Sequence, residues 1–212
     1  MTATNPRPER AFERAPGWAV DYRDRRFRSG SGAATDRRER RALRSLLARC
    51  EPAEGPWLDV PCGAGRMSGL LPGPVTQVDY AREMLGAIEG ADGPRIRASA
   101  FELPFADDAF SGVLCHRLLH HVPGRAERVA ILGELARVSR GAVIVSFFHA
   151  ASLQNLRRGL ARRLLRKRRS SRGGVSWRTF QRDLGEAGLK VVAVRALLPF
   201  VSEQWLVLAR RH

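Results

Sequence analysis

The sequence predicts an α/β fold built around a parallel sheet, and three observations support this prediction. A short apolar run, Trp57 to Val60, leads straight into a Pro-Cys-Gly-Ala-Gly turn, as a buried strand does where it opens onto a glycine loop. A second strand-like run, residues 75–79, ends in Asp79. Elsewhere, short apolar runs alternate with segments of helical spacing, which is typical of parallel strands joined by helices.

The same patterns predict the remaining elements in order. An Asp36-x-x-Glu39 start followed by leucines at helical spacing predicts the first helix. We expect helices over residues 36–50, 81–88, 125–139 and 177–187, and further strands over residues 94–98, 112–116, 142–147, 189–197 and 205–209. Another helix can begin at Arg66, where its N-terminus would favour polar or anionic groups.

Length and composition fit one domain. The chain has 212 residues, of which 44% are hydrophobic, enough for a sizeable core. The sequence shows neither a leader-like start nor an uninterrupted run of about eighteen apolar residues, so we expect a cytoplasmic protein. The three cysteines, Cys50, Cys62 and Cys115, are widely spaced, so neither a disulfide framework nor a metal site is expected.

Charge is concentrated in arginine. The net charge of +16 raises nucleic acid as a partner, but no helix-turn-helix, zinc finger or aromatic RNA-binding strand accompanies it, so we do not expect nucleic-acid binding. Residues 1–34 are rich in Arg, Pro, Gly and Ser, with anchoring aromatics at Trp18, Tyr22 and Phe27. This composition predicts a flexible segment ahead of a domain at 35–212.

The glycine loop and Asp79 together indicate a nucleoside-bearing cofactor. Gly63 and Gly65 carry no Cβ, so backbone N–H groups there can approach a ligand closely. Asp79 comes sixteen residues after Gly63, and its carboxylate can accept both hydroxyls of a ribose. The dinucleotide fingerprint does not fit, because the next glycine after Gly65 is Gly69.

Three stretches resemble class I S-adenosylmethionine-dependent methyltransferases of the type 11 and ubiquinone/menaquinone biosynthesis groups. Residues 58–65, Leu-Asp-Val-Pro-Cys-Gly-Ala-Gly, resemble motif I, with Pro61 in place of its first glycine. Residues 79–85 resemble the acidic residue and Met-Leu helix that follow. Residues 101–114, Phe-Glu-Leu-Pro-Phe-Ala-Asp-Asp-Ala-Phe-Ser-Gly-Val-Leu, are similar to the family's Leu-Pro-Phe-x-Asp-x-x-Phe-Asp stretch and are the most specific match.

The resemblance implies a Rossmann-like, doubly wound, mostly parallel seven-stranded sheet with an antiparallel last strand. It also implies S-adenosylmethionine as the cofactor. The residues that it assigns to cofactor binding are Asp59, Pro61, Cys62, Gly63, Ala64, Gly65, Asp79, Tyr80, Met84, Ser99, Ala100, Phe101, Cys115 and His116.

Two family features bear on neighbouring residues. Ser99 stands where the family usually has an aspartate for the adenine amine, so we expect stacking and backbone contacts around Ala100 and Phe101 to hold adenine. The family's N-terminal segment often covers the cofactor, so Tyr22 and Phe27 belong either to such a flap or to a loosely attached tail.

The sequence identifies no clear catalytic residue. His116, His120 and His121 are similar to the family's Ser-Asn-x-x-Leu-His-His stretch at the mouth of the site. They are weak candidates for a general base, and the alternative is that they pack under the cofactor. Methyl transfer from a sulfonium relies chiefly on proximity and alignment, which agrees with the lack of a clear catalytic residue.

A basic segment follows the fifth predicted strand. The leucines of residues 153–172 share one helical face, and nine Arg and Lys residues occupy much of the rest. The resemblance implies a lid insertion here, at about residues 151–174. Its charge suggests an acidic substrate or peripheral contact with an anionic membrane, and a solvated helix is the alternative.

We therefore expect a methyltransferase that acts on an O, N or C nucleophile of a small or lipid-linked acceptor. A nicotinamide-dependent reductase is one alternative, disfavoured by the missing third glycine and the lack of a Tyr-x-x-x-Lys pair. The other is a non-catalytic, methyltransferase-like binding protein, for which Pro61 and Ser99 are the hints.

Overall fold

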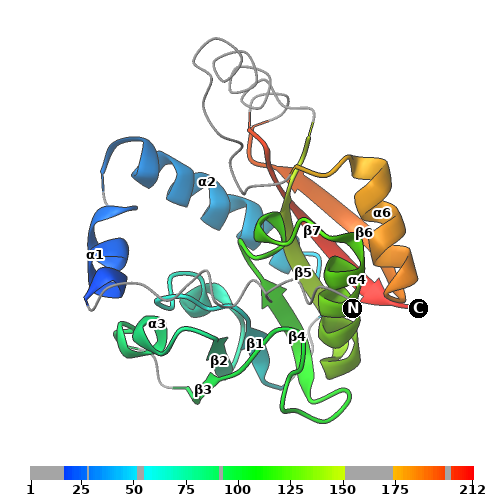
Figure 1. Cartoon of the computed structure of the whole chain (residues 1–212), viewed down its shortest axis with the longest axis horizontal. Coiled ribbons are helices and arrows are strands. Elements are labelled where there is room, and N and C mark those ends of the chain that lie inside the picture. The colour runs from blue at the N-terminus through cyan, green and yellow to red at the C-terminus, as the bar shows by residue number, and fades with distance from the viewer. Residues whose placement is uncertain (1–16, 28, 52–54, 91–92, 151–173, 199–201) are drawn as a thin grey trace, which may run out of the picture.

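The computed structural model describes residues 17–27, 29–51, 55–90, 93–150, 174–198 and 202–212. One seven-stranded sheet has the order β3-β2-β1-β4-β5-β7-β6 (Figure 1). Its strands are β1 (Trp57–Asp59), β2 (Val75–Asp79), β3 (Arg95–Arg97), β4 (Phe110–Cys115), β5 (Ser139–Phe148), β6 (Leu189–Ala196) and β7 (Gln204–Arg211). The first five strands pair in parallel, and β7 is antiparallel to both β5 and β6. The expected α/β class and the antiparallel last strand are confirmed.

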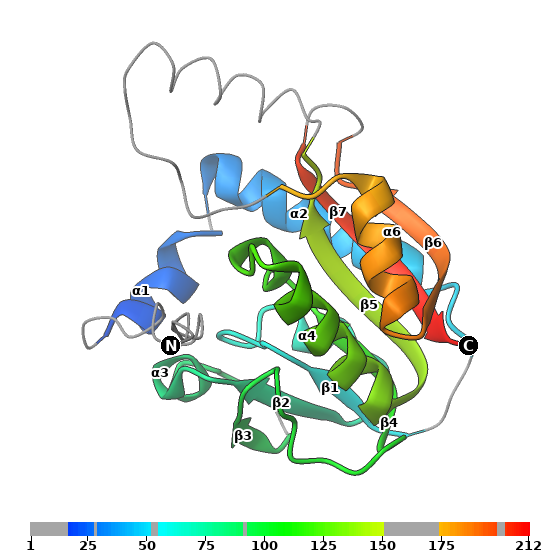
Figure 2. The same ribbon diagram turned by 45° about the vertical axis from the view of Figure 1, so that its right-hand side comes forward.

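Helices cover both faces of the sheet. They are α1 (Trp18–Arg25), α2 (Gly30–Leu47), α3 (Arg82–Gly86), α4 (Arg125–Val138) and α6 (Trp177–Glu186). Figure 2 shows α4 and α6 side by side on one face and α2 on the other. The alternation of side chains along β5 explains this, since Val143 and Val145 join the core cluster that includes α4 and α6, whereas Ile144 joins the cluster under α2.

The prediction of a helix from Arg66 is wrong, because the glycine loop is followed by a single 3₁₀ turn, Ser68–Leu70. Pro72 and Pro74 lie just beyond it and leave too little chain for a longer helix before β2. The face that such a helix would cover is filled by α2 and by Met67 and Leu71, which belong to the same buried cluster.

The N-terminal part is more structured than its composition predicts. Trp18–Arg25 is a helix within the segment predicted to be flexible, because Ala19 is buried against α3. Helix α2 begins at Gly30 and not at Asp36, after Ser29 in an extended conformation. The two alanines that follow, residues 33–34, are strong helix formers. The boundary at residue 34 stays a prediction.

The end of β5 and the approach to α6 are joined by backbone hydrogen bonds. The N–H of Val175 donates to the carbonyl of Phe148 at 2.8 Å, and the N–H of Ala150 donates to the carbonyl of Val175 at 3.1 Å. The basic helix predicted over residues 153–172 lies outside the described residues. Within the described ranges, none of the helices is long and apolar enough to cross a membrane.

Candidate active site

A cavity of about 550 Å³ opens at the carboxyl ends of β1, β2 and β4. In this sheet order β1 has β2 on one side and β4 on the other, so the strand order reverses at this point, where ligands bind in open α/β sheets. Among the residues predicted for the cofactor, those that line the cavity are Asp59, Pro61, Cys62, Gly63, Ala64, Asp79, Tyr80, Met84, Ser99, Ala100, Phe101 and His116.

Two residues predicted for the cofactor do not line this cavity. Cys115 is completely buried in the core cluster beneath it. Gly65 is needed for another reason, since it has φ of +74° and a Cβ there would lie 3.0 Å from Ile88 and 3.1 Å from Gln77. The assignment of these two residues to the cofactor stays a prediction, because a motif indicates which loop approaches a ligand but not which side of each residue faces it.

Gly63 is the glycine that faces the cavity. Its φ is +56°, and a Cβ built on it meets no atom within 4 Å. The left-handed conformation favours glycine, and the lack of a side chain leaves the backbone accessible. Pro61 fits the loop because the positive φ angles fall on Gly63 and Gly65; the Val60–Pro61 bond is cis.

Asp79 connects the end of β2 to the glycine loop. Its Oδ2 accepts a hydrogen bond from the Gly63 N–H at 2.8 Å, and its Oδ1 accepts one from the Ala81 N–H at 2.9 Å. A carboxylate has about four acceptor positions, so these two bonds leave acceptor capacity for a ligand hydroxyl. Burial raises the pKa of Asp79, while these backbone bonds act in the opposite direction.

Asp59, at the end of β1, is 1% exposed and also lines the cavity. The Ser68 hydroxyl donates to its Oδ2 at 2.7 Å and accepts from Gln77 Nε2 at 2.9 Å. Burial raises the pKa of Asp59 to about 7, with Ser68 lowering it and the nearby Asp79 raising it. A neighbouring positive charge would therefore favour its ionised form.

The aromatic residues of the N-terminal segment cover the cavity. Trp18 and Tyr22 project from α1, and Phe27 follows it; all three line the cavity. Their rings meet edge to face, with centroids 6.1 Å apart for Trp18 and Tyr22 and 5.9 Å apart for Tyr22 and Phe27. For residues 17–27, this placement favours the interpretation as a flap and not as a loosely attached tail.

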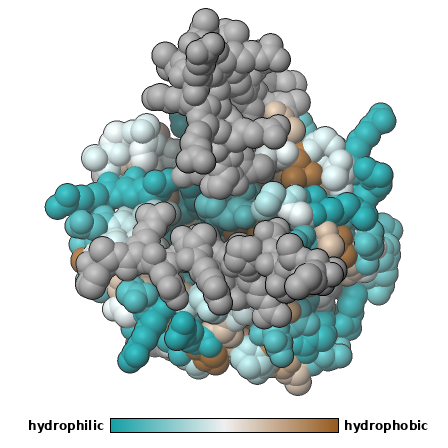
Figure 3. All heavy atoms as spheres, in the orientation of Figure 1, coloured by the Kyte–Doolittle hydropathy of each residue, from teal (hydrophilic) through white to brown (hydrophobic). Residues whose placement is uncertain are grey.

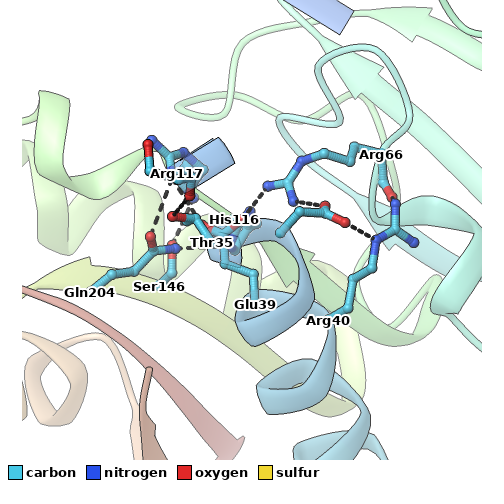
Figure 4. A network of polar contacts seen from close by, with 10 residues as sticks. Thr35, Glu39, Arg40, Arg66, His116, Arg117, Ser146 and Gln204 are labelled. Carbon is cyan, nitrogen blue, oxygen red and sulfur yellow. Dashed lines mark hydrogen bonds and ion pairs between the residues drawn. The ribbon is translucent and has the colours of Figure 1, made fainter. Parts of the chain in front are cut away.

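Glu39 on α2 is the centre of a buried polar network beside the cavity (Figure 4). Its carboxylate accepts from Arg66 at 2.6 Å and from Arg117 at 2.9 Å. Asp36, one turn earlier, accepts from Arg66 at 2.5 Å and from Arg40 at 2.7 Å. The network thereby joins α2 to the glycine loop and to the end of β4.

The charges around Glu39 determine its protonation state. Burial alone would raise the pKa of its carboxyl, but His116 and the guanidinium groups of Arg66 and Arg117 lower it to about 2. Glu39 is therefore ionised at neutral pH. The Arg117 backbone has φ of +63°, an uncommon conformation for a residue other than glycine, and its N–H donates to the Ser146 hydroxyl at 2.7 Å.

The same network fixes the tautomer of His116. Gln204 accepts from Arg117 through its Oε1 at 3.2 Å, so its Nε2 faces the His116 Nε2 at 3.0 Å. A donor there requires His116 Nε2 to be the acceptor, which leaves the proton on Nδ1. Burial lowers the pKa of His116 to about 3, so the ring is uncharged at neutral pH. His116 can act as a base only if Gln204 moves away.

The other two candidate histidines also line the cavity. His120 is 2% exposed and stacks on Phe148, with ring centroids 4.0 Å apart. His121 is half-buried and contacts His120. Neither arrangement identifies a base. In the described part of the chain, no group of His, Cys, Asp and Glu is placed to hold a metal ion.

Sequence reasoning missed the charged wall of the cavity. Asp36, Arg40, Arg66 and Arg117 line it and Glu39 supports them, yet none was a candidate. Asp36 and Arg40 stand at helical spacing, but Arg66 lies 30 residues from Asp36 and Arg117 lies 78 residues from Glu39, so no local motif joins them.

Comparisons with known proteins agree with this geometry. Residues 58–147 match the model of a family described as a methyltransferase domain. A protein of Encephalitozoon cuniculi described as a candidate methyltransferase is 36% identical over 107 residues, a match that covers 50% of this chain and 50% of that protein. The chain thus spans about half the length of this curated relative.

Solved structures share the whole fold. Magnesium protoporphyrin IX methyltransferase of Synechocystis, with bound S-adenosylhomocysteine, has a TM-score of 0.72 at 16% identity; the match covers 92% of this chain and 95% of that one. An S-adenosylmethionine-dependent methyltransferase of Clostridium acetobutylicum has a TM-score of 0.64 at 12% identity, covering 92% and 97%. These likenesses confirm the Rossmann-like sheet.

Proposed function

We propose that this chain, whose residues 58–147 match the model of a methyltransferase domain, transfers the methyl group of S-adenosylmethionine to an oxygen, nitrogen or carbon atom of a small acceptor. The observation that carries the proposal is the position of the cavity, at the ends of β1 and β2 within the matched residues 58–147. Its volume of about 550 Å³ suits a nucleoside-sized ligand.

The residues present fit this cofactor. Gly63 offers an open backbone approach, and Asp79 keeps acceptor positions for the ribose hydroxyls. Asp59 and Asp79 also place carboxylates on the wall of the cavity. Met84, Ala100 and Phe101 supply apolar surface for the adenine ring.

The chemistry requires little from the protein beyond placement. The bound cofactor supplies an electrophilic methyl group on a positively charged sulfur. The aromatic cover of Trp18, Tyr22 and Phe27 excludes water, and the fixed walls align the acceptor for in-line attack. Use of a lipid-linked acceptor through residues 153–172 stays a prediction, to be tested by sedimentation with anionic and neutral vesicles.

Calorimetry on the full chain tests the proposal. We expect roughly micromolar binding of S-adenosylmethionine and S-adenosylhomocysteine and no binding of NAD. Binding of NAD would support the reductase alternative. Silence toward all three ligands, from protein with a folded circular dichroism spectrum, would contradict the proposed function.

A matched pair of variants tests the role of Asp79. Asp79→Asn removes the charge that holds the ribose hydroxyls, so S-adenosylhomocysteine affinity should fall roughly tenfold to a hundredfold. Glu83→Gln removes a nearby exposed carboxylate that does not line the cavity and should leave the affinity unchanged. Equal affinities in the two variants would show that β2 does not contact the cofactor.

A further inference from the structure

A second cavity of about 310 Å³ adjoins the first. Both are lined by Arg26, Phe27 and Arg117, so these three side chains form the boundary between them. The second cavity extends from this boundary along α2, where Thr35 and Arg38 line it, toward the residues that precede β7. It is therefore placed to hold the part of an acceptor that lies away from the methyl group.

Positive charge dominates the wall of this second cavity. Arg26, Arg38 and Arg117 contribute three guanidinium groups, against the carboxylates of Glu203 on the wall and of Glu39, which pairs with Arg117, so one positive charge is in excess. Arg26 and Arg38 are exposed, and neither forms an ion pair with any acidic residue that the structure describes. Figure 3 shows hydrophilic residues over much of the coloured surface of one face of the molecule.

The Arg117 guanidinium is held in place and keeps free donors. Its Nη1 donates to Glu39 and to Gln204, while its Nε and Nη2 have no hydrogen-bond acceptor within the described ranges. Its side chain is 16% exposed, and the ion pair with the buried Glu39 limits its movement. A fixed guanidinium with unused N–H groups is suited to carboxylate or phosphate oxygens.

The ring of Phe27 separates this positive wall from the cofactor cavity. The Arg66 guanidinium lies 4.0 Å from the ring centroid, and those of Arg26 and Arg117 lie at 5.6 and 5.8 Å. An acceptor that crosses the boundary would pass this ring. Its methyl-accepting atom would then lie on the cofactor side and its charged group on the arginine side.

From these observations we infer that the second cavity binds an anionic group of the methyl acceptor, a carboxylate or a phosphate monoester, through Arg26, Arg38 and Arg117. The identification of the bound molecule as a methyl acceptor rests on the proposed function, whereas the anion-binding subsite itself does not. A single charge-assisted contact of this kind changes affinity roughly tenfold.

The test measures anion binding to the full chain by calorimetry, in the presence of saturating S-adenosylhomocysteine. Benzoate and phenyl phosphate are the probes and distinguish the two groups, whereas benzyl alcohol is the uncharged control. We expect one of the anions to bind and benzyl alcohol not to bind. Arg26→Gln and Arg38→Gln should each weaken that binding roughly tenfold.

Arg37→Gln is the matched control, because Arg37 is the exposed neighbour of Arg38 on α2 and lines neither cavity. It removes the same charge from a chain of net charge +16, so it reports any general attraction of anions. Equal weakening by Arg37→Gln and Arg38→Gln would overturn the inference, as would failure of both anions to bind to the parent protein. Lack of S-adenosylhomocysteine binding with intact anion binding would instead contradict the proposed function.

Discussion

Replacement of Glu39 by glutamine should destabilise the protein by about 3 kcal/mol at pH 7. Glu39 is fully buried and neutralises Arg66 and Arg117, and removal of one partner of a buried pair costs about 3 to 5 kcal/mol. The direction of the titration agrees with this cost, because the neighbouring cationic groups lower the pKa of Glu39 from 4.5 to about 2.

The pH dependence follows from the direction of this shift. Because the folded-state pKa of Glu39 is below the unfolded-state value, its contribution is fully present above about pH 4.5 and is lost as the pH falls through 2. Asp59 titrates in parent and variant alike, so most of its effect cancels in the difference. His116 lies 3.7 Å from Glu39 and the two groups shift each other's pKa, so the protonation of His116 near pH 3 is part of the difference.

Urea unfolding of parent and Glu39→Gln, followed by circular dichroism at pH 7, 4 and 3, measures this difference. Glu51→Gln is the control, because Glu51 is exposed and pairs with Arg210 at the surface, where ion pairs contribute below about 1 kcal/mol. The reasoning is refuted if Glu39→Gln is as stable as the parent at pH 7, or if the difference does not shrink between pH 7 and pH 3.

Three further predictions concern the fold and the cover. Asp59→Asn should be more stable than the parent at pH 8, by about 4 kcal/mol at most, because burial raises the pKa of the Asp59 carboxyl from 3.8 to about 7. This difference in unfolding free energy should shrink below pH 7 and vanish near pH 4, and urea unfolding at pH 5 and 8 measures it. Asp183→Asn should cost about 3 to 5 kcal/mol, seen as a lower thermal midpoint, because the buried Asp183 pairs with Arg128 at 2.9 Å between α6 and α4. Tyr22→Ala should speed S-adenosylhomocysteine release in stopped-flow experiments while Tyr22→Phe should not, because the ring forms the cover.

The central strands were predictable because their apolar runs are local. Trp57–Asp59 and Val75–Asp79 each follow a proline and end in an aspartate, which marks their bounds in the sequence. The sequence also contains the signal that limits the helix after the glycine loop to a short 3₁₀ turn, since Pro72 and Pro74 stand immediately beyond it.

The Glu39 network was not predictable in the same way. Arg117 lies 78 residues from Glu39, and Gln204 lies 88 residues from His116. Sequence reasoning recognises ion pairs at helical spacing, such as Asp36 and Arg40, but pairs formed by tertiary packing leave no periodic signal. The hydrogen bonds of Asp79 to backbone N–H groups are hidden for the same reason.

The backbone hydrogen bonds between Phe148, Ala150 and Val175 bring the two ends of the intervening segment to one point of the sheet. Loop-closure entropy grows only logarithmically with chain length, so doubling the number of residues between these anchors costs about 0.6 kcal/mol. Natural variants or grafts of different length can therefore be exchanged at this position without unfolding the sheet. A change in the length of this segment would then leave the strands around the 550 Å³ cavity unaltered.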